Sequence, residues 1–171
     1  RKNKAVQLIK KVTSYPTTLE TMLRANLRIP DGMDTELVQL HLTAAIDYVE
    51  DQCGVSITKK TVVQEYTLPL TKYKLKFLPE TIDEVVVNDE DVTDQVTYSE
   101  DVQPGYIFFS EVYYNPDGNK IRISYSCKAM DIPPALQVLI LSIASQFYNN
   151  PEGLPAPDVK RINMLLNQFA I

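Results

Sequence analysis

The residues that could support catalysis are few and lie far apart in the sequence. The only histidine, His41, falls on the same predicted helix as Cys53, twelve residues before it. That separation is about 18 Å along a helix axis, so the two side chains cannot form a nucleophile–base pair within one chain. A pair between His41 and Cys127 is geometrically open, but no pattern supports it. We expect His41 to have a structural role.

An acidic segment partly matches a calcium-binding loop. Residues 89–100, DEDVTDQVTYSE, place candidate ligands at loop positions one, three, five and twelve: Asp89, Asp91, Thr93 and Glu100. Loop position six is Asp94, where the sharp turn of such a loop requires glycine, and the flanking residues have the pattern of strands rather than helices. A solvated acidic hairpin is the favoured interpretation.

A group of carboxylates on a predicted helix is the remaining candidate for acid–base chemistry. Asp47, Glu50 and Asp51 are close in sequence, but neighbouring carboxylates on a polar helix face usually contact water, and we expect these three to point away from the core. No phosphate-binding loop, nucleophile elbow or paired C-x-x-C is present. The sequence therefore predicts no catalytic, metal-binding or cofactor-binding residues and a protein that is not an enzyme.

Charge is unevenly distributed along the 171 residues, whose net charge is −5. Residues 1–16 contain five basic residues and no acid, whereas residues 80–117 contain eleven acidic residues and no lysine or arginine. Such a body should repel DNA, because non-specific affinity comes from clustered lysine and arginine. Only the basic arm, residues 1–16, could attract nucleic acid, and a solvated terminus is the favoured interpretation of it.

Composition also bears on location. An apolar content of 44% is sufficient for a hydrophobic core. We find no signal-peptide or lipidation pattern and expect a reducing cytoplasm as the default location. Cys53 and Cys127 then suit small buried side chains, although a single bridge between them stays open.

Two helices are predicted near the start of the chain. Thr17 and Glu20 suggest a capping box for a short helix that starts at residue 17. Asp34 can cap a longer helix that Gly54 ends. The core stripe of the longer helix comprises Val38, Leu42, Ala45, Ile46, Val49 and Cys53.

A third helix, within residues 131–153, has no charged side chain between Asp131 and Glu152. Asp131 is the expected N-cap, Pro133 and Pro134 fit the first turn, and Pro151 follows the end, so the helix is about 16 residues long. This is shorter than the roughly 20 apolar residues of a membrane span. Because the helix is apolar on nearly all sides, other helices, a sheet or another subunit must cover it.

Residues 57–128 have the period-two pattern of strands, and we expect roughly six of them. Residues 82–92 suggest a strand that enters a tight acidic turn, and residues 105–126 suggest a hairpin around Asn115–Gly118. Tyr73, Leu75 and Phe77 alternate with Lys72, Lys74 and Lys76. The lysines are expected to protect an exposed sheet edge; alternatively, they meet the acidic segment of a neighbouring copy.

Together these patterns predict an α+β fold, a helical bundle of about four helices with an inserted all-β module. The expected parts are a basic arm, helical regions, the β module, a linker and a C-terminal helix: 1–16, 17–56, 57–128, 129–150, 151–157 and 158–171. The last helix has an apolar stripe of Val159, Ile162, Leu165, Leu166 and Phe169. This stripe either completes the bundle or docks elsewhere through the proline-rich linker.

Residues 18–153 resemble the head-tail connector proteins of long-tailed bacteriophages, also called adaptors or head completion proteins. The match to the opening helix and the long helix comprises Leu23, Asn26, Leu27, Arg28, Ile29, Asp34, Leu37, Ala44, Ala45, Tyr48, Val49, Glu50 and Gly54. The match to the later signature comprises Tyr125, Ile132, Pro133, Leu136, Ile140 and Tyr148. Lys128 replaces a glycine of the family, and Asn149 and Asn150 stand where many members have an arginine.

The resemblance implies a structural connector in the virion, assembled in the host cytoplasm. Such a protein forms a ring, usually of twelve copies, beneath the portal, closes the DNA exit after packaging and offers a docking surface to the tail or a stopper protein. DNA would pass through the lumen without sequence-specific binding, and no cofactor or membrane is implied. An acidic body suits this role, because a basic lumen would hold DNA that must slide.

The resemblance also suggests interfaces. We assign the portal contact to the C-terminal stripe of Val159, Ile162, Leu165, Leu166 and Phe169. We assign the contact between subunits to Leu136, Ile140, Ile143, Phe147, Lys72, Lys74 and Lys76. The alternative is a monomeric or dimeric protein-binding module without catalytic activity, which would use an aromatic β face of Tyr106, Phe108, Phe109, Tyr113 and Tyr114.

Overall fold

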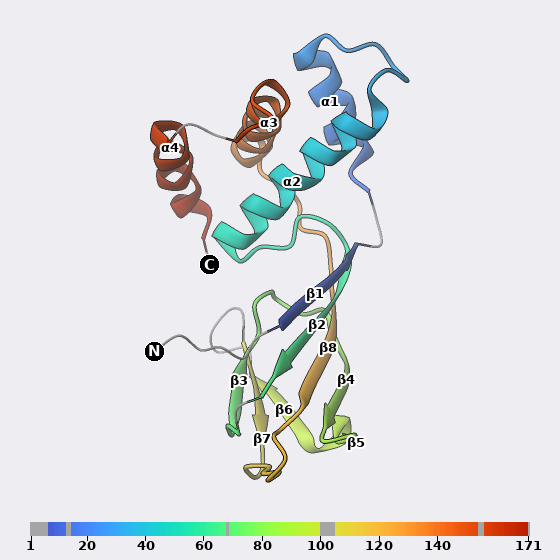
Figure 1. The fold of residues 1–171 in the computed structure, drawn as a ribbon, viewed down its shortest axis with the longest axis vertical. Coiled ribbons are helices and arrows are strands. Elements are labelled where there is room, and N and C mark those ends of the chain that lie inside the picture. Colours follow the sequence, from blue (N-terminus) through green and yellow to red (C-terminus); the bar gives the residue numbers. More distant parts are fainter. Residues whose placement is uncertain (1–6, 13–14, 68, 100–104, 154–155, 171) are drawn as a thin grey trace. The chain divides into compact units, whose positions relative to one another are not determined.

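The computed structural model describes residues 7–12, 15–67, 69–99, 105–153 and 156–170 (Figure 1). It has the predicted α+β fold, and the chain divides into two compact units. The helical unit comprises Tyr15–Ile57 and Met130–Ile171, and the β unit comprises Arg1–Ser14 and Thr58–Ala129. Each unit has a hydrophobic core of its own.

Four helices form the described part of the helical unit. They are α1 (Thr17–Leu27), α2 (Thr35–Cys53), α3 (Pro134–Asn149) and α4 (Ala156–Leu166), and a 3-10 turn, η2 (Asn167–Phe169), follows α4. The first three helices pack against one another, and α4 packs on α2 and α3. The predicted core stripe of α2 is buried along its whole length. The charge-free helix is α3, and its buried residues belong to the core of its own unit.

Two predicted helix caps differ in the structure. α3 begins at Pro134, with Pro133 at the N-cap position, so Asp131 lies before the cap. Asp34 is the N-cap residue of α2, but its side chain makes no capping hydrogen bond to the helix. Its carboxylate accepts a hydrogen bond from the Tyr148 hydroxyl instead (3.0 Å), which links the start of α2 to the end of α3.

The buried guanidinium of Arg24 holds the loop between α1 and α2. It donates to the carbonyl oxygens of Pro30 (3.2 Å) and Met33 (2.6 Å) and to the Glu20 carboxylate (3.3 Å). Thr17 and Glu20 therefore form no capping box, because Thr17 is already helical and Glu20 pairs with Arg24. A buried charge is tolerated here because several acceptors satisfy it.

Two antiparallel sheets form the β unit. The strands are β1 (Gln7–Val12), β2 (Lys60–Tyr66), β3 (Lys72–Lys74), β4 (Thr81–Val87), β5 (Glu90–Asp91), β6 (Val96–Ser99), β7 (Tyr106–Phe109) and β8 (Ile121–Cys127). A 3-10 turn, η1 (Thr93–Gln95), connects β5 to β6. One sheet has the order β1-β2-β8-β4-β5 and the other β3-β7-β6. Tyr73, Leu75 and Phe77 are buried in the core of this unit, as their alternation predicted.

A hydrogen-bonded group of polar side chains lies within the β unit. Gln64 donates to the Tyr66 hydroxyl (2.7 Å), which donates to the Lys74 carbonyl oxygen (2.6 Å). The side-chain oxygen of Gln64, Oε1, accepts hydrogen bonds from the backbone N–H of Lys76 (2.9 Å) and from the Tyr125 hydroxyl. Burial raises the pKa of Tyr66 and Tyr125 well above the ordinary value, so both phenols stay protonated and can donate.

The hairpin predicted for residues 105–126 is wrong. The turn itself forms, with the Gly118 N–H bonded to the Asn115 carbonyl oxygen (3.0 Å). However, β7 and β8 belong to different sheets, and the connection formed by residues 110–120 crosses from one sheet to the other. The predicted tight acidic turn is present between β4 and β5, where Asn88 and Asp89 both have positive φ.

The expectation of a solvated arm is wrong for residues 7–12. These residues form β1, which pairs with β2 along its whole length. Leu8 packs against the core of the β unit, whereas Ile9 and Lys11 are exposed. Apolar residues flank the lysines in this strand. The basic charge of the segment alone favours a solvated terminus and does not indicate a strand.

Candidate assembly surfaces

The candidate nucleophile and base are enclosed by their own unit. His41 lies partly buried on α2, and its ring meets that of Tyr148 edge to face with centroids 5.8 Å apart. The buried Cys53 thiol lies 3.5 Å from the Leu166 carbonyl oxygen, and burial raises its pKa, which lowers the thiolate fraction. Cys127 is buried in the β unit, and neither cysteine forms a disulfide in the described structure.

The calcium-loop candidates have other partners. Asp91 accepts hydrogen bonds from the N–H (2.9 Å) and the hydroxyl (2.5 Å) of Thr93, and the bond from the hydroxyl is the main reason why its pKa is lowered. Glu100 lies outside the described residues. Among the residues that are described, no group of three or more histidine, cysteine or acidic side chains could hold a metal ion.

Glu50 does not point to solvent as predicted. Its side chain is fully buried, and Oε2 accepts a hydrogen bond from the Ile57 N–H (2.9 Å). Asp51 is exposed, as expected, and Asp47 is partly so. Glu50 therefore joins the end of α2 to the segment that leaves it.

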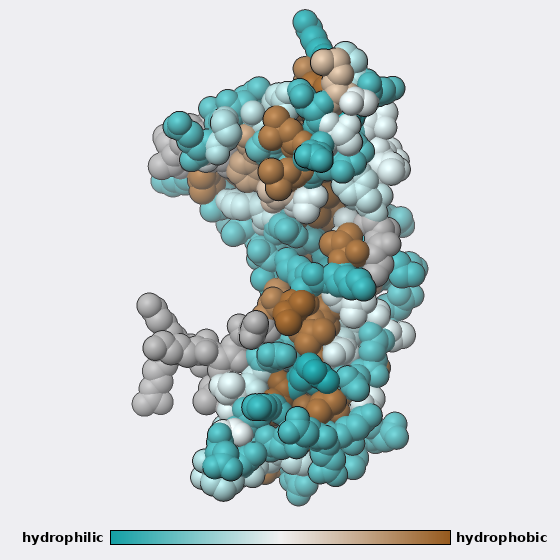
Figure 2. Space-filling model, turned by 45° about the vertical axis from the view of Figure 1, so that its right-hand side comes forward, coloured by the Kyte–Doolittle hydropathy of each residue, from teal (hydrophilic) through white to brown (hydrophobic). Residues whose placement is uncertain are grey.

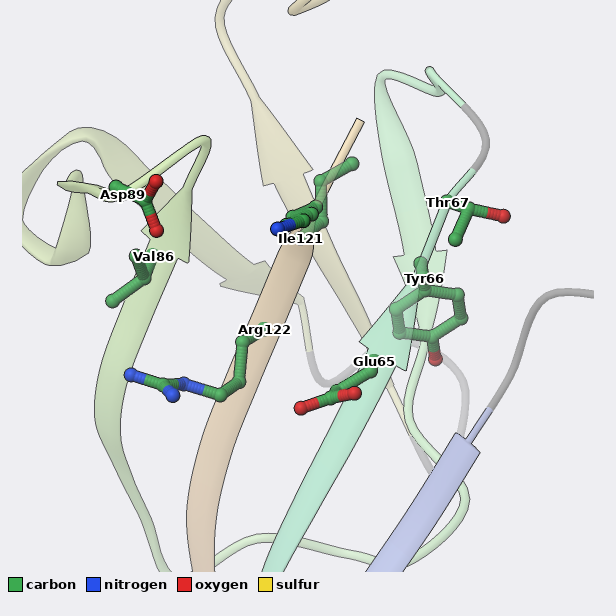
Figure 3. A pocket seen from close by; sticks show the side chains of 8 residues that line it. Glu65, Tyr66, Thr67, Val86, Asp89, Ile121 and Arg122 are labelled. Carbon is green, nitrogen blue, oxygen red and sulfur yellow. The ribbon is translucent and has the colours of Figure 1, made fainter. Parts of the chain in front are cut away.

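A small open pocket of about 180 Å³ lies on the five-stranded sheet (Figure 3). Its lining combines acidic and basic side chains, and Figure 3 shows Glu65 and Arg122 on the neighbouring strands β2 and β8. Arg122 forms an ion pair with Glu84 of β4, with 3.5 Å between the guanidinium nitrogen and the carboxylate oxygen. A pocket of this size is smaller than typical small-molecule sites, and we assign no ligand to it.

The predicted portal stripe packs partly into its own bundle. Ile162 and Leu166 are buried in the core of the helical unit, and Phe169 packs against that core. Leu165 is 39% exposed, and its neighbour Met164 is 67% exposed. In this conformation, therefore, the bundle holds one side of α4 and solvent contacts the other.

The residues of α3 that we assigned to a subunit interface are mostly enclosed. Leu136, Ile140 and Ile143 are fully buried, and Phe147 is partly buried against the same core. Val138, in contrast, is 65% exposed. Any contact between copies through the middle of this helix must therefore use the Val138 side.

A second apolar stripe runs along α2, and sequence reasoning missed it. Leu37 and Leu40 are 42% and 63% exposed, Ala44 continues them at helical spacing, and Met33 is exposed just before the helix. We call Leu37, Leu40 and Ala44 the outer α2 stripe. The face of the helical unit in Figure 2 likewise shows hydrophobic patches among hydrophilic groups. Spacings of three and four residues could have identified the stripe.

The predicted lysine stripe lies at a sheet edge. β3 is the outer strand of its sheet, and Lys72 and Lys74 are exposed there. Lys76 is partly buried, with its ammonium 5.7 Å from the centre of the Phe77 ring. This position agrees with both interpretations of the lysines, edge protection and contact with another copy.

The aromatic residues of the alternative hypothesis do not share one face. Phe109 is buried and meets Tyr113 edge to face, with centroids 5.7 Å apart. Phe108 and Tyr114 are exposed, and Tyr106 is partly buried. Because β7 alternates between core and solvent, these five side chains cannot contact one partner together.

Among the comparisons with known proteins, only the comparison with solved structures finds chains similar to this one. No protein-family model and no curated protein matches the chain. A chain in the neck of an empty GTA particle, computed with C6 symmetry, superimposes with a TM-score of 0.68 at 16% identity, over 95% of both chains. The chain thus shares the fold of that neck chain.

Two further solved structures agree. A chain in the virion of a native gene transfer agent (GTA) particle has a TM-score of 0.66 at 16% identity, with 95% of both chains covered. A chain in the neck of a native GTA particle, computed with C12 symmetry, has a TM-score of 0.61 at 17% identity and covers 96% of this chain and 94% of that one. The likeness thus extends over both units.

No helix among the described residues is long and apolar enough to cross a membrane.

Proposed function

We propose that this chain is a structural, non-enzymatic component of the neck of a phage-like particle. It assembles as a ring beneath the portal, closes the DNA exit after packaging and provides the docking surface for the tail or a stopper protein. The observation that carries the proposal is the likeness to neck chains over 95% of this chain, helical unit and β unit alike. The C6 and C12 symmetry of those necks supports a ring of copies.

The proposed ring has two kinds of contact in the helical unit. Copies meet through exposed apolar side chains, for which the outer α2 stripe and Val138 are the candidates, because such side chains gain most from burial. The portal contact uses α4, through Leu165 and Met164. Ile162 and Leu166 could join this contact only if α4 left its bundle.

The lumen of the proposed ring passes DNA without binding its sequence. The net charge of the chain is −5, and an acidic body that does not neutralise phosphates lets DNA slide. The remaining partners are further copies of the chain, the portal protein and a tail-side protein.

A monomeric or dimeric binding module remains the second candidate. Phe108 and Tyr114 favour it, because both side chains are large, apolar and exposed on the β unit. The module would bind its partner without forming a ring, so imaging of particle necks distinguishes the two functions.

Deletion of the chain from the genome that encodes it tests the proposed function. We expect heads that package DNA but lose it and carry no tails, because the exit is neither closed nor extended. Supplying the protein to such heads should restore tailed particles. Normal tailed particles without the chain would contradict the proposal.

A further inference from the structure

The β unit carries opposite charges on its two lateral sides. One side is formed by the outer strands β1 and β3, and the other by β4, β5 and η1. We call them the basic side and the acidic side. Within the unit, Figure 1 shows β1 and β3 on one flank and β4 and β5 on the other.

Contacts between the two sheets place β3 on the same side as β1. The Tyr66 ring of β2 lies 4.8 Å from that of Tyr73 in β3. Lys10 of β1 and Lys76, which follows β3, both lie over the Phe77 ring, at 5.1 Å and 5.7 Å from its centre. Lysines from β1 and from the segment after β3 therefore meet on one side of the unit.

The basic side carries exposed lysines, and the ammonium of Lys72 lies over the Tyr106 ring, 5.3 Å from its centre. Lys11 of β1 and Lys72 and Lys74 of β3 are exposed, and neither strand contains an acidic residue. Both strands lie at sheet edges, so their outer backbone groups face away from the sheet. An edge strand with exposed lysines does not pair readily with an identical edge, because like charges repel.

The acidic side is equally distinct. Glu90 and Asp91 form β5, the opposite edge of the five-stranded sheet, and Asp89 and Asp94 flank it; all four are exposed. Hydrogen bonds from Val92 to Val85 (2.9 Å) and from Val85 to Thr93 (2.9 Å) hold η1 beside β4, which adds Asp94 to this side. Two bases lie nearby. Arg122 pairs with Glu84, and Lys120 is exposed.

We infer that the basic side of the β unit docks on the acidic side of a second copy of this chain. The inference rests on the proposed ring, and charge complementarity selects this partner. Because the two sides lie on opposite flanks of the same unit, the contact is heterologous. Each copy uses its basic side for one neighbour and its acidic side for the other. Heterologous contacts close into rings when the rotation closes, whereas two copies facing each other would place like charges together.

Charge reversal tests the inference on the full-length chain. Variant A carries Lys72→Glu and Lys74→Glu, and variant B carries Glu90→Lys and Asp94→Lys. We expect the unmodified chain to associate with increasing concentration in low-salt buffer, and each variant alone to stay monomeric by sedimentation velocity. An equal mixture of A and B should associate again, because each altered side then meets its altered counterpart.

A matched control separates this contact from general repulsion. Lys128→Glu with Lys160→Glu changes the net charge as variant A does, but at exposed lysines that belong to neither β1 nor β3. The control should associate like the unmodified chain, and added salt should weaken association. Circular dichroism verifies that every variant is folded.

The outcomes distinguish this inference from the proposed function. If A or B associates as well as the unmodified chain, or if the mixture stays monomeric, the inference is wrong. An unmodified chain that stays monomeric in low salt also overturns it. None of these results affects the proposed neck function, because a ring can form on the portal through the helical unit.

Discussion

A buried carboxylate holds the segment that follows α2. Glu50 is fully buried, and its Oε2 accepts the Ile57 N–H at 2.9 Å. A buried N–H that loses its acceptor costs about 1–3 kcal/mol, and truncation also leaves a cavity. Single substitutions of Glu50 measure the effect.

We predict that Glu50→Ala lowers the free energy of unfolding by about 2–4 kcal/mol, because both costs apply. Glu50→Gln should cost less, since its amide oxygen can still accept from Ile57. Gln52→Ala, at an exposed position on the same helix, should change stability by about 0.5 kcal/mol or less. Urea unfolding followed by circular dichroism at the helix band measures all three, and equal effects of Glu50→Ala and Gln52→Ala would contradict the prediction.

The sequence placed Glu50 on the polar face because carboxylates are rarely buried. Its spacing from Ile46 and Cys53 nevertheless matches the core stripe. The N–H that makes its burial possible belongs to Ile57, beyond the end of the helix. Helix periodicity cannot identify such a partner, because the path of the chain after the helix is a tertiary property.

At the scale of elements, α4 has two sides with different roles. Leu166 is 1% exposed and belongs to the core of the helical unit, whereas the adjacent Leu165 is 39% exposed. The core side holds the helix in place, and the exposed side is available for the proposed portal contact.

We predict that Leu166→Ala destabilises the helical unit by about 2–4 kcal/mol, because it removes a buried side chain and leaves a cavity. Leu165→Ala should cost less than about 1 kcal/mol but weaken binding to the portal. Thermal melting measures the first effect and co-sedimentation with portal rings the second. If the two variants melt alike, α4 does not pack as the structure has it.

The helices were more predictable than the strand pairing for a physical reason. The bounds and core stripe of α2 follow from residues three and four apart, and Gly54 ends the helix through a positive φ. Strand pairing joins residues far apart: β2 pairs with both β1 and β8. The pattern of residues 105–126 contains a turn, but nothing in it tells whether the flanking strands remain in one sheet.

For the whole molecule, exposed side chains are the best guide to assembly, and sequence alone identified them poorly. The family resemblance led us to assign Leu136, Ile140 and Ile143 to an interface, yet these are buried within one copy. An apolar residue looks the same in sequence whether its own core or a neighbour covers it. The outer α2 stripe and Val138 became candidates only when the bundle showed which faces remain uncovered.

Cryo-electron microscopy of the neck of intact particles, made by the genome that encodes this chain, tests the central claim most directly. We predict a ring of copies next to the portal, with six- or twelve-fold symmetry, in which density for each copy fits a four-helix unit and a two-sheet β unit. DNA density should run through the ring or stop at it. A neck reconstruction that has no density for this fold would contradict the account.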